Sequence, residues 1–370
     1  MTTREKLNDI VNDITNVYNG NRTAKMRAIF ECLTSDGITD AATLRNMCED
    51  ALDYHNKGAI YNAWAAWSGR ANYARTRRAA ARPVVAPITT GTDYNAFTFG
   101  VEFECGFKRT YFEDHYRTRE AAVRALIEKA RYFGLTVVDR GCADHHDSRT
   151  AWKVCSDASL SSGANLYCMI ELVSPILEGV DGWTQLEKMC NVCELVGISV
   201  NQSCGTHVHL GVKDESWNTL KNVGINYSLA YKAYCKALHN SRGEGSDCGT
   251  RWARTYNERE LTTLRNTERA EDMFTYGGLC GDVRGAGHYP SSRYRAVNYV
   301  AYHQRKTLEF RQHQDTVDFR KVQSWLKDKM ELITWSRNNV LSGYTDDIEA
   351  MAWQSDDTRC NFRMRALRYA

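Results

Sequence analysis

The feature that most constrains the fold is an alternating segment, Phe97–Glu104. Apolar residues at 97, 99, 101 and 103 alternate with Thr98, Gly100, Glu102 and Glu104. This period of two predicts a half-buried strand with one apolar and one polar face. The polar face carries two carboxylates, because residues two apart on a strand point the same way.

Glu102 and Glu104 therefore lie side by side on the predicted strand. Like charges repel unless a cation or hydrogen bonds lie between them. A hard divalent cation such as Mg²⁺ or Mn²⁺ would satisfy both carboxylates. An amphipathic strand with an acidic solvent face is the alternative, and this segment alone leaves both open.

The segment Cys204–His209 places His207 and His209 on one strand face in the same way. Such a pair binds a metal, or divides between a metal and a substrate. Cys204 adds the option of zinc, whose usual ligands are Cys and His. Two hydrogen-bonded structural histidines are the alternative.

Glu309 and Arg311 also share a predicted strand face. They form either a surface ion pair, which contributes little to stability, or a metal-binding carboxylate beside a phosphate-binding guanidinium.

Glu171 lies within an apolar run, where burying a carboxylate without a partner costs free energy. Arg293 is either a solvated loop residue or a second phosphate contact.

The glycines form neither a GxxxxGK[ST] loop nor a GxGxxG turn after a strand. A phosphorylated ligand would therefore have to be held by divalent ions and arginines. This arrangement serves phosphoryl transfer, because the metals neutralise charge that develops on the phosphate oxygens.

The chain divides into three predicted regions. Apolar stripes at helical spacing predict an all-helical N-terminal region, 1–82. Pro83 and Pro87 predict an extended linker, 83–96. Strands and helices mix without regular alternation over 97–370, which favours an α+β fold with a mainly antiparallel sheet. The expected helices there lie at 122–130, 186–196, 218–239 and 319–338, and the strands at 135–138, 169–173, 198–200, 207–212 and 307–312.

The net charge of +3 does not indicate a nucleic-acid binder. The sequence has one local cluster of arginines: Arg70, Arg75, Arg77, Arg78 and Arg82. The cluster is either the solvated end of a helix or a contact for an anionic or protein partner. The 13 cysteines are scattered along the chain, and residues 1–20 have no apolar signal core. Because the chain has no apolar run of about 18 residues, we expect no membrane span. We also expect a cytoplasmic location, in which the cysteines stay reduced.

Five segments together resemble one family. They are Gly100–Glu104, Ser156–Leu160, Glu171–Leu177, Cys204–His209 and Thr307–His313. Their order and character are similar to those of the amidoligase family, the glutamine-synthetase-like group of carboxylate–amine ligases often found in phage and mobile operons. The resemblance covers about Phe97 to Ser336.

The resemblance implies a sheet that forms a glutamine-synthetase-like cup with flanking helices, and a location in the host cytoplasm if the gene is carried by a phage. It implies ATP, two or more Mg²⁺ or Mn²⁺ ions, and an amide or isopeptide bond made through an acyl phosphate. The implied substrates are a small-molecule or peptide carboxylate and an amine.

The same resemblance assigns roles to residues. The implied metal ligands are Glu102, Glu104, Glu171, His209 and Glu309. Arg311 is implied to contact the transferred phosphate. Further roles, in catalysis or in binding substrate or nucleotide, are implied for Asp157, Ser159, His207 and Arg293. Ala158 stands where family members usually have glycine, which affects only the fine geometry of that turn.

Two other functions stay open from the sequence. A zinc hydrolase would use Cys204, His207 and His209, with His145 or His146 as a further ligand. A catalytically inactive protein on the same scaffold would bind ligands without turnover.

Overall fold

The computed structural model describes residues 91–141, 150–156, 160–243, 246, 251–275, 278–281 and 291–369. The predicted helical region 1–82, the linker up to residue 90 and the arginine cluster lie outside these residues, so those predictions stand as made. Within the described chain, a 3-10 turn at Tyr94–Ala96 precedes the first strand, and the Tyr94 hydroxyl donates to Glu331 at 2.5 Å.

The described chain forms an α+β fold around one open, mainly antiparallel sheet, as the sequence predicts. The strands are β1 (Thr98–Lys108), β2 (Val137–Gly141), β3 (Trp152–Cys155), β4 (Leu166–Val173), β5 (Leu177–Glu178), β6 (Ile198–Ser199), β7 (Gly205–Gly211), β8 (Val297–Asn298) and β9 (Thr307–Gln314). Their order is β2-β3-β4-β1-β7-β9-β8, with β5 and β6 also paired to β1. Only β2 and β3 pair in parallel among these described strands. β1 is therefore the central strand, with partners on both sides.

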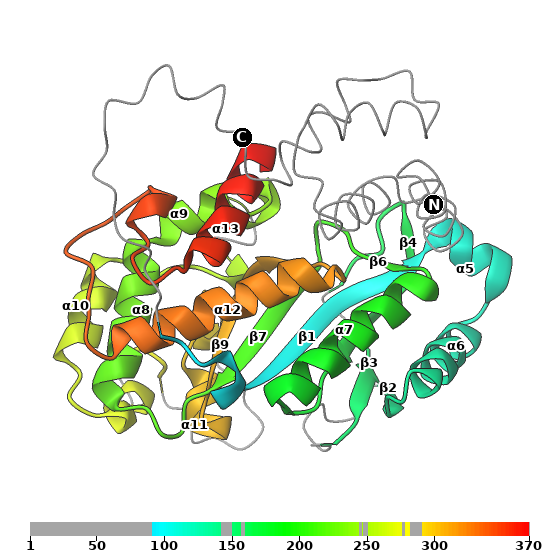
Figure 1. Cartoon of the computed structure of the whole chain (residues 1–370), viewed down its shortest axis with the longest axis horizontal. Coiled ribbons are helices and arrows are strands. Elements are labelled where there is room, and N and C mark those ends of the chain that lie inside the picture. The colour runs from blue at the N-terminus through cyan, green and yellow to red at the C-terminus, as the bar shows by residue number, and fades with distance from the viewer. Residues whose placement is uncertain are drawn as a thin grey trace, which may run out of the picture. The chain divides into compact units, whose positions relative to one another are not determined.

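The helices are α5 (Arg109–His115), α6 (Arg119–Tyr132), α7 (Gly179–Leu195), α8 (Trp217–Leu229), α9 (Tyr231–Lys236), α10 (Glu258–Asn266), α11 (Val300–Arg305), α12 (Phe319–Ser336) and α13 (Asp356–Tyr369). In Figure 1, α7 and α12 lie across one face of the sheet, in front of β1 and β7. α8, α9 and α10 lie beyond the β9 edge.

The predicted helices are present, with one correction. The helix expected at 218–239 is two helices, because α8 ends at Leu229, α9 begins at Tyr231, and Ala230 between them has non-helical backbone angles. Ala230 donates its N–H to the Asn226 carbonyl, which closes the last turn of α8. Gly197 follows α7 with φ of +75°, the left-handed conformation expected at a helix end.

The apolar face of β1 packs under these helices. Phe99, Val101 and Phe103 are at most 2% exposed. The Phe99 ring lies 4.5 Å from that of Trp183 in α7, measured between centroids. Because strand residues alternate, burial of this face sends Glu102 and Glu104 to the opposite face.

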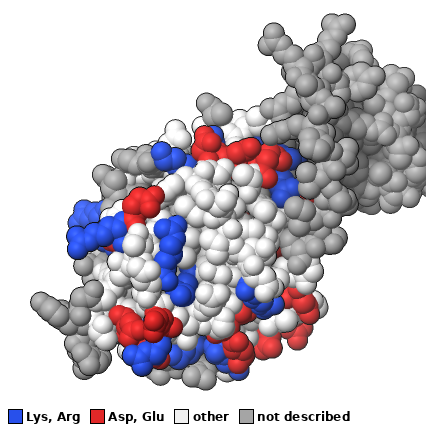
Figure 2. Space-filling view, turned by 90° about the vertical axis from the view of Figure 1, so that its left-hand side faces the viewer, with Lys and Arg blue, Asp and Glu red and all other residues white. Residues whose placement is uncertain are grey.

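Figure 2 shows one side of the molecule, where Lys and Arg mix with Asp and Glu around a broad uncharged area. Neither sign dominates this side, in keeping with the small net charge. Among the described helices, none combines the length and hydropathy needed to cross a membrane.

Candidate active site

Strand register brings the two predicted histidines and two of the predicted glutamates onto one face of the sheet. Glu102 lies opposite His207 across β1 and β7. His209 lies opposite Glu309 across β7 and β9. Direct cross-strand partners project to the same face, so three neighbouring strands supply one cluster.

Glu104 and Glu171 extend the cluster toward β4. They are direct partners across β1 and β4, and each is 8% exposed. Glu104 accepts a hydrogen bond from the Gly205 backbone N–H at 2.5 Å, which fixes one of its oxygens. The predicted metal ligands thus come from four adjacent strands, β4, β1, β7 and β9.

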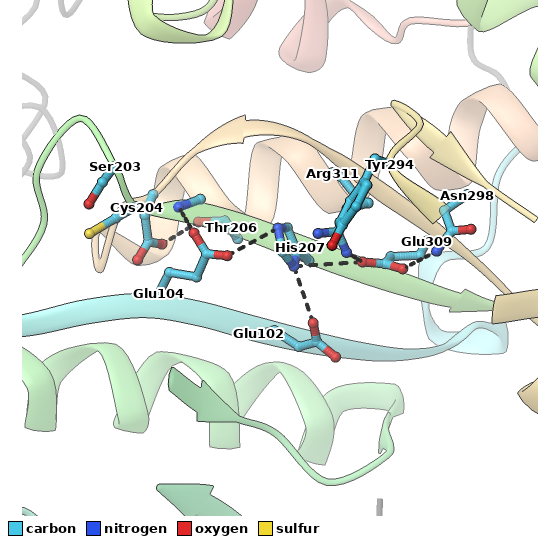
Figure 3. A network of polar contacts seen from close by, with 12 residues as sticks. Glu102, Glu104, Ser203, Cys204, Thr206, His207, Tyr294, Asn298, Glu309 and Arg311 are labelled. Carbon is cyan, nitrogen blue, oxygen red and sulfur yellow. Dashed lines mark hydrogen bonds and ion pairs between the residues drawn. The ribbon is translucent and has the colours of Figure 1, made fainter. Parts of the chain in front are cut away.

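His207 lies at the centre of the acidic side chains (Figure 3). Its Nδ1 is 3.2 Å from Glu102 Oε2 and 3.6 Å from Glu309 Oε1. Its Nε2 is 3.5 Å from Glu104 Oε1. The sequence assigned His207 to catalysis or substrate, and the geometry places it among the carboxylates.

His209 offers a nitrogen to the same centre. Its Nε2 lies 3.2 Å from Glu102 Oε1, is buried, and forms no aligned hydrogen bond within the described chain. Its Nδ1 lies 3.2 Å from the Thr307 hydroxyl, which orients the ring. A buried nitrogen aimed at a carboxylate without a hydrogen bond is suited to bind a metal ion.

Two groups of side chains have ligand atoms close enough to hold a cation. One is Glu102, His209 and Glu309, and the other is Glu102, Glu171 and His207. Within each group these atoms lie within 4.8 Å of one another. Mostly oxygen ligands with one imidazole suit Mg²⁺ or Mn²⁺. Glu102 belongs to both groups, so it would bridge two ions.

Opposite charges keep the carboxylates of Glu102 and Glu309 ionised. Burial raises the pKa of Glu102, but the charge of His209 and the contact with His207 outweigh burial and hold this pKa well below its ordinary value. Burial likewise raises the pKa of Glu309, and Arg311 with His209 brings it below the ordinary value. Burial alone would lower the pKa of His209, but the neighbouring charge of Glu102 outweighs burial and brings this pKa above its ordinary value.

Glu309 is held from two directions. Arg311 forms an ion pair with its Oε1, and the Asn298 side chain donates to its Oε2 at 2.6 Å. Asn298 comes from the two-residue strand β8 and is 3% exposed. The sequence alone does not predict this contact of Asn298, because a two-residue strand has no periodicity to detect.

The sequence also missed two buried cations beside the cluster. Lys153 is 3% exposed and pairs with Val173, itself the partner of Glu102, so it shares the polar face. The Arg242 guanidinium lies across Gly205, where a Cβ would meet its Nη1 at 3.0 Å. Lys153 had no detectable sequence signal, because the four residues of Trp152–Cys155 are too few to show a period of two.

Arg293 lies near Arg311, beside the Tyr294 ring. Asp157 and Ser159, like His145 and His146 of the zinc alternative, lie outside the described residues.

Cys204 is oriented away from the histidines. Its thiol contacts Asn201, at 3.4 Å from the side-chain oxygen. Burial raises its pKa to about 12, whereas a zinc ligand must be a thiolate. Neither candidate metal group in the described part of the chain includes a cysteine.

Comparison with known proteins gives one match. A family model described as "Putative amidoligase enzyme" matches residues 95–333. The matched range contains all four strands of the cluster and its arginines. No curated protein and no solved structure matches the chain.

Proposed function

Because the chain belongs to the amidoligase family, we propose that it is an ATP-dependent carboxylate–amine ligase that uses Mg²⁺ or Mn²⁺. The observation that carries the proposal is the pair of candidate metal groups sharing Glu102. Magnesium and manganese are the usual partners of ATP phosphates, and their ligands in proteins are mainly oxygens. A glutamine-synthetase-like cup is part of this proposal.

In the proposed reaction, a substrate carboxylate oxygen attacks the γ-phosphorus of ATP and ADP leaves. An amine then attacks the acyl carbon, phosphate leaves, and the amine loses a proton. The metals would supply charge neutralisation on the phosphate oxygens. Arg311 and Arg293 would bind those oxygens through their planar guanidinium groups.

Other side chains and backbone groups would hold the metal ligands in position. Asn298 and Arg311 hold Glu309 in place, and Glu104 is fixed by the Gly205 N–H. Partners of this kind orient metal ligands, and losing one typically weakens metal binding about 10–100-fold. The candidates for binding the carboxylate or amine substrate are Asp157, Ser159 and Lys153.

The test is ADP release in the presence of Mg²⁺ across mixtures of carboxylates and amines, with mass spectrometry of the products. Glu102→Gln removes the shared ligand and should lower turnover at least about 10³-fold, since both metal groups lose an oxygen charge. Glu215→Gln is the control, because Glu215 belongs to neither metal group and pairs with Arg337. Full activity of Glu102→Gln, or turnover without nucleotide, contradicts the proposal.

A further inference from the structure

A group of arginine and aromatic side chains lies beside the Glu309 end of the cluster. Backbone pairing brings three segments together there. Arg254 and Arg295 form a parallel bridge, the Ala296 N–H donates to the Arg254 carbonyl at 3.0 Å, and the Arg311 N–H donates to the Ala296 carbonyl at 3.0 Å. Residues 251–254, 293–296 and 309–311 are therefore neighbours.

Arg295 is committed to holding this arrangement. It is 3% exposed, forms an ion pair with Glu260, and lies 4.7 Å from the Tyr256 ring centre. Arg254 also reaches Glu260, at 3.6 Å. Arg295 thus anchors α10 to the segment before β8, whereas the Arg254 side chain stays 46% exposed.

The neighbouring side chains form what we call the arginine–aromatic wall: Arg251, Trp252, Arg293, Tyr294 and Arg311. Tyr294 is its centre. The Arg293 guanidinium lies 4.8 Å from the Tyr294 ring centre and donates to its hydroxyl at 2.9 Å. The Arg311 guanidinium lies 5.9 Å from the same ring centre. One ring therefore positions both arginines.

Trp252 continues the wall away from the metal groups. Its ring meets Tyr294 edge-on, with centroids 4.8 Å apart, and Arg251 lies 4.8 Å from its ring centre. Trp252, Arg293 and Tyr294 are each half-buried, so part of each side chain is open to a ligand. Figure 3 shows Tyr294 beside Arg311 and Glu309, at the edge of the cluster.

Arg311 has binding capacity left over. It pairs with Glu309 through Nη1, while its buried Nε has no hydrogen-bond partner within the described chain. A guanidinium with a free donor beside a metal-binding carboxylate is a site for a phosphate oxygen.

We propose that ATP lies along this wall, with its phosphates on Arg311 and Arg293 and its nucleobase against Trp252. The inference rests on the proposed ligase function and adds the orientation of the nucleotide and the residue that recognises its base. A flat base stacks on an exposed aromatic face, and cations beside that face add to the attraction. The carboxylate and amine substrates would then occupy the opposite end, near Glu104, Glu171 and Lys153.

The experiment compares binding of Mg–ATP and of Mg–tripolyphosphate, which has no base, by isothermal titration calorimetry. Trp252→Leu keeps an apolar side chain and removes the aromatic face, while Trp252→Phe retains an aromatic face. We expect Trp252→Leu to weaken ATP binding about tenfold or more, with tripolyphosphate affinity unchanged. Trp252→Phe should restore most of the ATP affinity.

Tyr167→Leu is the matched control, since Tyr167 is an exposed aromatic residue with Arg109 lying over it at 5.2 Å, on β4 outside the wall. Its ATP affinity should equal that of the unmodified protein. Equal ATP affinity in Trp252→Leu and the unmodified protein overturns this inference and leaves the ligase function standing. Parallel loss of ATP and tripolyphosphate binding in Trp252→Leu also overturns it. An unmodified protein that binds neither ligand overturns the proposed function along with it.

Discussion

At the scale of single residues, the most unusual environment outside the active site belongs to Lys329. This α12 lysine is fully buried, with its Nζ 3.4 Å from the ring centre of Trp325 and 3.7 Å from that of Tyr234. It donates to Asp328 at 2.6 Å. Burial lowers the pKa of Lys329 to about 7, although Asp328 partly opposes the shift.

This lowered pKa has a predictable effect on stability. Between pH 7 and the ordinary lysine pKa near 10.4, the unfolded chain holds a proton that the folded chain has released. The free energy of unfolding should therefore rise with pH in this window. From pH 7 to 8.5 the Lys329 contribution to the rise should be on the order of 1–2 kcal/mol, measured by urea unfolding.

Lys329→Met should remove that contribution and flatten the profile. Asp328 would keep donors from Tyr234, Trp353 and Gln354. Lys327→Met is the control, because Lys327 is a half-buried lysine of the same helix. Identical pH profiles for Lys329→Met and the unmodified protein would show that Lys329 remains charged in the core.

At the scale of elements, α8 supports the short strand β8. Gly224 of α8 faces Tyr299, which follows β8 directly and is fully buried. The Tyr299 hydroxyl donates to the Leu220 carbonyl at 2.6 Å. A Cβ at Gly224 would overlap that hydroxyl oxygen and lie 3.1 Å from a Leu264 methyl carbon. The close approach positions β8, and with it Asn298 beside Glu309.

Replacing Gly224 tests this packing. Gly→Ala within a helix ordinarily stabilises by about 1 kcal/mol. Here overpacking should reverse the sign, and Gly224→Ala should lower the free energy of unfolding by about 1–3 kcal/mol. The cost should shrink in a Tyr299→Phe background, which removes the overlapped oxygen, and a double-mutant cycle of urea midpoints measures the difference. A stabilising Gly224→Ala would refute the close contact.

The elements also show what the sequence could and could not predict. β1, β7 and β9 were predicted because each has one polar and one apolar face, which produces a period of two. β3 has only four residues, all buried, and β8 only two, so neither gives a periodic signal. The contacts of Asn298, Arg242 and Tyr294 depend on pairing between distant segments, and no local pattern encodes such pairing.

At the scale of the whole molecule, the cluster joins four adjacent strands through glutamate and histidine side chains. A cation in either metal group would contact three strands at once, and the two groups together include side chains from β4, β1, β7 and β9. Such binding would stabilise only the folded chain, since the ligands are far apart in the sequence. Mutual repulsion of the carboxylates would fall at the same time.

Thermal unfolding should therefore respond to metal. Adding Mn²⁺ or Mg²⁺ to EDTA-treated protein at about 100 times the dissociation constant should add about 2.7 kcal/mol of stability. For a domain of this size, that corresponds to a rise of several degrees in Tm. Scanning fluorimetry measures the shift, which should be largely lost in Glu102→Gln and retained in Glu215→Gln. Equal shifts in both variants would place the ion elsewhere.

The pairing of Glu102 with His207 and of His209 with Glu309 has a last consequence. Strand side chains alternate, so a slip of one residue between β1 and β7 would turn both histidines toward the helices and put valine and leucine in their place. A molecule with that error would be unable to bind the ions or turn over. Catalytic titration of a preparation would thus count the molecules that have folded in the right register, independently of how much protein is in solution.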